Sequence, residues 1–115
     1  MKLNEIFKNI SYRGQAEGDR NTYYIFETSS HYVVLSPNST SGFNMNLVDR
    51  EVPDVIRKKF SGQRVTGPLL RRTARRPDLF KAPFGPLNAL YVMVGLGLAR
   101  KLRQHQGKAM VFKIR

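Results

Sequence analysis

The sequence predicts an α+β fold in which an N-terminal helix and a three-stranded antiparallel sheet pack against a basic half made of three helices and a β-hairpin. Three observations lead to this prediction. Apolar residues change from helical to alternating spacing and back along the chain. Segments rich in Gly, Pro, Asn and Ser separate the periodic stretches. Residues 1–50 carry five Lys/Arg and five Asp/Glu, whereas residues 51–115 carry fifteen Lys/Arg and three acids, which accounts for the net charge of +12.

Composition limits the class of protein. About 41% apolar residues is enough for a core in a chain of 115 residues, so we expect a globular body with two parts, residues 1–50 and residues 51–115. The chain has no Cys, which excludes disulfides and thiolate metal ligands and fits a cytoplasmic or nucleoid-associated protein. The longest apolar stretch, residues 87–99, is too short to span a bilayer, so no membrane partner is expected.

The neutral first half is expected to contain one helix and three strands. Residues 2–10 are predicted to be helical because their apolar side chains recur at i, i+3, i+4 and i+7. Residues 11–21 are polar, contain two glycines and indicate a loop. Three β-prone or alternating segments then predict an antiparallel meander: residues 22–28, 31–36 and 43–47.

The basic second half is expected to contain three helices and a hairpin. Helical spacing of apolar side chains predicts a helix over residues 52–60. A second helix begins after the N-cap Thr66 and ends near residue 76, before a proline. The third, over residues 87–99, is apolar on nearly every side. Two short β-prone runs around a polar tip predict the hairpin: residues 99–103 and 109–114.

The order of these C-terminal elements is the main clue to function. Residues 60–66 link the first helix to the second, Gly97-Leu98-Ala99 leads from the third helix into the hairpin, and residues 108–113 return as its second strand. In this order residues 52–114 resemble the winged helix-turn-helix superfamily of DNA-binding domains. The resemblance implies a third helix that enters the major groove and a hairpin wing that reaches the neighbouring groove or backbone.

Two features depart from that family's pattern. The third helix offers only Asn88 and Tyr91 as polar side chains near its start, and ten residues, 77–86, separate it from the second helix. These features indicate either a groove-reading surface poor in base-specific donors or a third helix partly buried against the N-terminal sheet. We therefore expect phosphate contacts to dominate, with modest sequence discrimination.

Four arginines at i, i+1, i+4 and i+5 on the second helix are expected to form one cationic face. Guanidinium groups suit this role because they bind phosphate oxygens and guanine edges bidentately. The preceding link, the following loop, the third helix and the hairpin add further candidates. The expected DNA-binding residues are Arg64, Thr66, Arg71, Arg72, Arg75, Arg76, Lys81, Asn88, Tyr91, Arg103, His105 and Lys108.

The function predicted from these observations is non-enzymatic binding of double-stranded DNA, by a small transcriptional regulator or a DNA-binding module of a larger system. RNA binding is an alternative, because small size and high positive charge suit structured RNA equally well. A nuclease or nuclease subunit using acids near residue 50 is a third possibility, although the sequence favours a role for Glu51 and Asp54 in stabilising the start of the next helix. His31 and His105 have no ligand-spaced neighbours, so no catalytic residue, metal site or cofactor is expected.

The neutral half is expected to bind something other than phosphate. Alternation along its strands could expose a row of aromatic side chains, which would pair two protomers, contact a protein partner or stack on unpaired bases. A homodimer or protein partner is the preferred interpretation. The aromatic candidates are Tyr23, Tyr24, Phe26, Tyr32 and Phe43.

Overall fold

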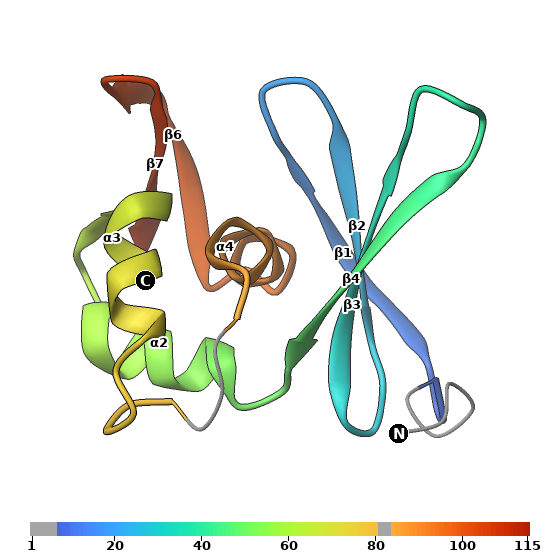
Figure 1. Ribbon diagram of the computed structural model, residues 1–115, viewed down its shortest axis with the longest axis horizontal. Helices are drawn as coiled ribbons and strands as arrows, with labels where there is room; N and C mark the ends of the chain where they lie inside the picture. Colours follow the sequence, from blue (N-terminus) through green and yellow to red (C-terminus); the bar gives the residue numbers. More distant parts are fainter. Residues whose placement is uncertain (1–6, 81–83) are drawn as a thin grey trace.

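The computed structural model describes residues 7–80 and 84–115, which form seven strands in two antiparallel sheets together with three helices (Figure 1). The first sheet has the strand order β1-β2-β3-β4 and the second has the order β5-β7-β6. Along the chain the elements are β1 (Ser11–Glu17), β2 (Thr22–Glu27), β3 (His31–Pro37), β4 (Phe43–Asp49), α2 (Val52–Phe60), β5 (Arg64–Thr66), α3 (Gly67–Ala74), α4 (Pro86–Gly95), β6 (Ala99–Gln106) and β7 (Ala109–Ile114).

The predicted fold class was wrong. The described chain is mostly β, its strands come first, and its helices lie in the middle and toward the C-terminus, so it is not the helix-first winged helix-turn-helix protein that the sequence indicated. The first sheet has four strands and not three, because residues 11–17, expected as part of a loop, form β1. The expected helix over residues 2–10 lies mainly outside the described residues, and residues 7–9 form a turn.

The sequence did not predict β1, because this strand is held in place by a close contact with α4, which lies far away along the chain. It pairs antiparallel with β2 and carries a register irregularity between Tyr12 and Gly14. Gly14 has a φ of +152°, and a Cβ there would collide with the carbonyl oxygen of Gly95 on α4. A Cβ on Gly95 would in turn overlap the side chain of Ile25. These two glycines therefore let the first sheet lie directly against α4. The local sequence pattern does not indicate this contact.

The other expected elements are present with shifted ends. The meander strands, α2 and the C-terminal hairpin lie where the sequence placed them, and the hairpin strands extend until only Gly107 and Lys108 form the turn. α4 ends at Gly95, four residues before the predicted end. The three-residue strand β5 was not expected, and its pairing with β7 turns the hairpin into a three-stranded sheet.

α4 is the centre of the molecule and lies between the two sheets, seen end-on in Figure 1. It contacts all four strands of the first sheet, both other helices and β6. Five consecutive residues, from Ala89 to Met93, are buried, which explains why the helix is apolar on nearly every side. Ile25 from the first sheet and Phe112 from the second belong to the same buried cluster. The third helix is thus buried against the N-terminal sheet, the second of the two alternatives above. Within residues 7–80 and 84–115, no helix has the length and apolar character needed to cross a membrane.

Candidate nucleic-acid interface

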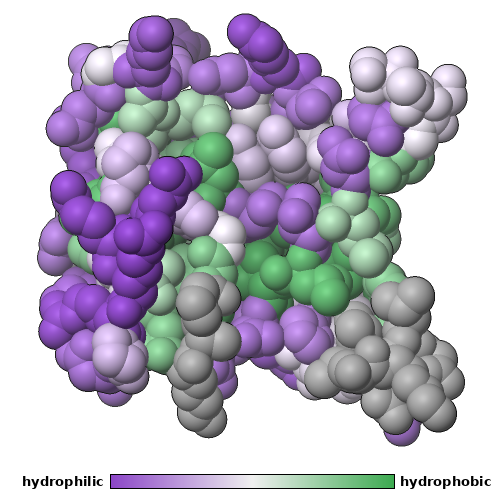
Figure 2. All heavy atoms as spheres, in the orientation of Figure 1, coloured by the Kyte–Doolittle hydropathy of each residue, from purple (hydrophilic) through white to green (hydrophobic). Residues whose placement is uncertain are grey.

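The arginine face, defined here as Arg71 and Arg72 on α3 and Arg75 at its C-cap, is exposed as the helical spacing predicts. Thr66 begins the helix, and its hydroxyl accepts a hydrogen bond from the Leu69 amide at 3.4 Å. The opposite side of the helix is buried, so the three guanidinium groups lie on the solvent side. Figure 2 shows strongly hydrophilic side chains gathered over this helix.

Arg76, the fourth predicted arginine, is placed differently. It lies beyond the end of α3, and its guanidinium donates two hydrogen bonds to Asp78, at 3.2 Å to Oδ1 and 2.7 Å to Oδ2. The bonded Arg76 holds the pKa of Asp78 below its usual range. Much of the Arg76 charge is therefore already matched by a carboxylate. The arginine face makes no such pair with any carboxylate of the described residues.

A hollow of about 300 Å³ joins the arginine face to the C-terminal hairpin. Arg71 and Lys108 both line it, from α3 and from the turn of the hairpin. Leu87, at the start of α4, and Met110, on β7, provide apolar wall. Two cations from distant segments thus converge on one concave surface, whose lining also includes Asp19, a carboxylate that is itself paired with Lys101 and His105.

Asp19, on the β1–β2 turn, ties the neutral half to the hairpin. Its carboxylate pairs with His105 Nε2 at 3.0 Å and with Lys101 Nζ at 2.9 Å. The hydrogen bond with His105, followed by that with Lys101, holds the pKa of Asp19 below its usual range. His105, predicted as a DNA contact, is therefore engaged within the protein. Asp19 was not a candidate in the sequence, because only the folded chain brings it to β6.

Two predicted contacts lie in the protein interior. Tyr91 is 4% exposed and stacks on Tyr23, with ring centroids 3.9 Å apart. Burial raises the pKa of the Tyr91 hydroxyl, and a hydrogen bond with Tyr23 adds to this shift. Thr66 is 9% exposed, and its hydroxyl serves as the N-cap described above. These placements argue against direct contact of either side chain with DNA.

The remaining candidates lie around the same half of the molecule. Asn88 is half-buried in the first turn of α4, and Arg103 is exposed on β6. Arg64 is exposed on β5, away from the arginine face of α3. Lys81 lies outside the described residues. Sequence reasoning missed Arg100 and Lys113 because only the strand register shows that they stand beside Arg64.

Glu27 and Asp49 pair with cations of the first sheet and its edge, whereas Glu51 and Asp54, at the start of α2, form no ion pair within residues 7–80 and 84–115. Glu27 pairs with Arg13 and, at 2.6 Å, with Arg50. Asp49 pairs with His31 Nε2 at 3.1 Å. In the part of the chain that the structure describes, no three His, Cys, Asp or Glu side chains gather in a way that could hold a metal ion.

Comparisons with known proteins found no matching family model, no similar curated protein and no similar solved structure. The resemblance of residues 52–114 to winged helix-turn-helix domains therefore receives no support from relatives.

Proposed function

We propose that this protein binds double-stranded DNA without catalysing a reaction, mainly through phosphate contacts from α3 and the β6–β7 hairpin. The observation that carries the proposal is the convergence of Arg71 and Lys108 on one hollow, with Arg72 and Arg75 extending the cationic surface along α3. Mutual repulsion among these cations falls when phosphates lie between them and release their counterions.

The distribution of ion pairs supports a polyanionic partner. In the first half, Glu27 and Asp49 pair with basic side chains of the same half. In the second half three acids face fifteen Lys/Arg, so cations greatly outnumber the carboxylates that could neutralise them. Such an excess attracts nucleic acid over long distances and accelerates association.

The shape of the cationic surface favours a duplex. Arg71, on α3, and Arg75, at its C-cap, are about one helical turn apart, or about 6 Å along the helix axis. The hairpin extends beside α3 (Figure 1). The hollow lined by residues of both elements makes the surface between them concave. α4 is buried and presents only its first turn, with Asn88, as a source of base-specific hydrogen bonds. Binding should therefore show little preference among DNA sequences.

A titration tests the proposal against its alternatives. The protein is titrated with random-sequence duplex DNA, single-stranded DNA and a structured RNA, each at two salt concentrations. We expect the tightest binding to duplex DNA and a steep loss of affinity with salt. Tighter binding to RNA or to single strands would refute the choice of duplex DNA, and affinity independent of salt would refute phosphate-dominated binding.

We also propose that the outer face of the four-stranded sheet pairs two copies of the chain. Tyr12, Phe43 and Met45 are 53%, 61% and 44% exposed. Cross-strand register places Met45 opposite Leu35, and Tyr12 opposite Phe26, on this same face. The residues Tyr24, Phe26, Leu35, Pro37 and Phe43 line a hollow of about 310 Å³.

A second copy of the chain suits this face because two chains that each carry a net charge of +12 repel each other least where their neutral halves come into contact. The face belongs to the neutral half, and Figure 2 shows apolar side chains on the side formed by the first sheet. Tyr23 and Tyr32, by contrast, pack with the core, so only part of the predicted aromatic row is available. Sedimentation equilibrium should show a dimer that Phe43→Gln/Met45→Gln converts to a monomer. A wild-type chain that stays monomeric at high concentration would remove the proposal.

A further inference from the structure

A row of three cations crosses the second sheet. Arg64 on β5 pairs across from Lys113 on β7, and Lys113 pairs across from Arg100 on β6. Residues directly opposite each other in antiparallel strands project from the same face. The neighbours Val65 and Phe112 are fully buried, so alternation places the three cations on the outer face, away from the core. We call Arg64, Lys113 and Arg100 the cationic row.

The row works against the stability of the isolated protein. Like charges directly opposite in neighbouring strands repel one another, and Lys113 in the middle has a cation on each side. No carboxylate of residues 7–80 or 84–115 forms an ion pair with any of the three. An acidic side chain at position 113 would relieve the repulsion. A bound anion would do the same.

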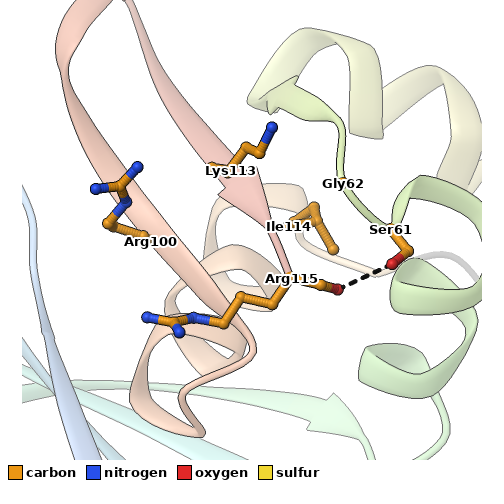
Figure 3. A pocket seen from close by; sticks show the side chains of 6 residues that line it. All are labelled: Ser61, Gly62, Arg100, Lys113, Ile114 and Arg115. Carbon is orange, nitrogen blue, oxygen red and sulfur yellow. Dashed lines mark hydrogen bonds between the residues drawn. The ribbon is translucent and has the colours of Figure 1, made fainter.

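The row borders a hollow whose lining includes three cationic residues. Figure 3 shows Arg100, Lys113 and Arg115 around a hollow of about 450 Å³, whose other lining residues are Ser61, Gly62 and Ile114. Hydrogen bonds fix its floor: the Gly62 amide donates to the Ile114 carbonyl at 2.9 Å, and the Ser61 hydroxyl donates to the Arg115 carbonyl at 3.2 Å. The cations are thus mounted on a rigid frame, which lowers the entropic cost of holding a ligand.

The positive surface continues past the hollow. A second hollow of about 450 Å³ shares Arg100 and Arg115 with the first and extends along β6 toward β1. Arg103 adds a further cation there, whereas Glu17 is the carboxylate in its lining. One small anion would occupy only one of the two hollows, whereas an extended chain of phosphates would contact the cations of both.

The cationic row and the arginine face look out from different sides of the second sheet. α3 packs on the inner face, where Leu70 shares the buried cluster with Val65 and Phe112. The row lies on the outer face. A duplex seated on the arginine face therefore leaves the row uncovered.

From these observations we infer that the outer face of the second sheet is a second binding site for the phosphodiester backbone, so that one protomer holds two nucleic-acid segments. Two strand spacings of about 4.8 Å make the row about 10 Å long. This length corresponds to about three phosphates of one DNA strand, counted along the duplex axis at about 3.4 Å each. The inference rests on the proposed function and extends it from one phosphate-binding surface to two.

The test counts short random-sequence duplexes bound per protomer at low salt, by analytical ultracentrifugation at concentrations well above the dissociation constant. We expect two for the wild type, one for Arg100→Gln/Lys113→Gln and one for Arg71→Gln/Arg75→Gln. Two duplexes on the Arg100/Lys113 variant would overturn the inference. One duplex on the wild type and none on the Arg71/Arg75 variant would also overturn it while leaving the proposed function intact. No duplex on the wild type would refute both.

A second measurement separates nucleic acid from a small phosphate ligand and controls for folding. Thermal unfolding is followed for the wild type and for Arg100→Gln/Lys113→Gln, with and without inorganic pyrophosphate. Without ligand, we expect the variant to melt at the same temperature or higher, because repulsion in the row is relieved. If pyrophosphate raised the melting temperature of the wild type alone while the duplex count stayed at one, the site would be a small-phosphate site and the nucleic-acid assignment would be overturned.

Discussion

Replacing Arg71 and Arg75 by glutamine removes two charges from the exposed side of α3. Both side chains are exposed and neither pairs with a carboxylate of the described residues, so their whole charge is available to phosphate. Glutamine favours helix almost as well as arginine, so the stability of α3 should change little. We expect weaker binding to every duplex sequence, because phosphate contacts carry no sequence information.

The size of the loss follows from counterion release. Each phosphate contact contributes about 0.9 to the slope of log K against log salt, so two lost contacts make the slope shallower by about 1.8. At about 0.1 M salt the same term lowers affinity about 60-fold, or about 2.4 kcal/mol. Fluorescence anisotropy with a labelled random duplex, repeated at several salt concentrations, measures both quantities.

Two control variants separate the arginine face from charge in general. Arg76→Gln/Asp78→Asn removes a guanidinium that is already bonded to a carboxylate, leaves the net charge unchanged, and should change affinity far less. Arg71→Lys/Arg75→Lys keeps the charge and should keep the salt slope. If Arg71→Gln/Arg75→Gln bound as many duplexes per protomer as the wild type, with the same affinity and salt slope, the assignment of the arginine face would be wrong.

Three further predictions address the packing that positions this surface. Thr66→Ala should lower the free energy of unfolding in urea by about 1 kcal/mol, because an N-cap is lost, and leave duplex affinity of the folded protein unchanged; a selective loss of affinity would instead make Thr66 a contact. Gly95→Ala should cost about 1–3 kcal/mol in the same assay, because the new methyl group overlaps Ile25; full stability would contradict the close approach of α4 to the first sheet. The bond with His105 lowers the pKa of Asp19, so its contribution to stability is complete above about pH 4 and is lost as the pH falls through the lowered pKa. The melting temperature of Asp19→Asn should therefore depend less on pH below about pH 4 than that of the wild type. An equal dependence would refute the stabilising contact between Asp19 and the hairpin.

The sequence could predict the elements whose hydrophobic periodicity is local. α2 and the strands of the meander were found this way, because their buried side chains recur at the helical or the strand period. β1 could not be found, since its residues are mostly exposed and the strand exists through the long-range approach of Gly14 to Gly95. The missed β1 changes a three-stranded sheet into four strands. The unexpected β5, the longer hairpin strands and the shorter α4 further raise the share of β structure.

Residues of the candidate site likewise differ in whether local periodicity or long-range packing determines their position. Exposure of Arg71, Arg72 and Arg75 follows from the helical period alone. The burial of Tyr91 depends on how α4 packs against the first sheet, which local sequence does not specify. The cationic row depends on register, because a shift of one residue would move Lys113 to the other face of its sheet.

The most direct test of phosphate-dominated duplex binding is to map, by NMR, which residues of the wild-type protein respond to a random-sequence duplex at low salt. We expect the signals of Arg71, Arg75 and Lys108 to shift and then to return as salt is added, while those of Tyr24 and Phe43 on the outer face of the first sheet stay in place. Shifts confined to that apolar face, with α3 and the hairpin unchanged, would contradict duplex binding by the cations of α3 and the hairpin.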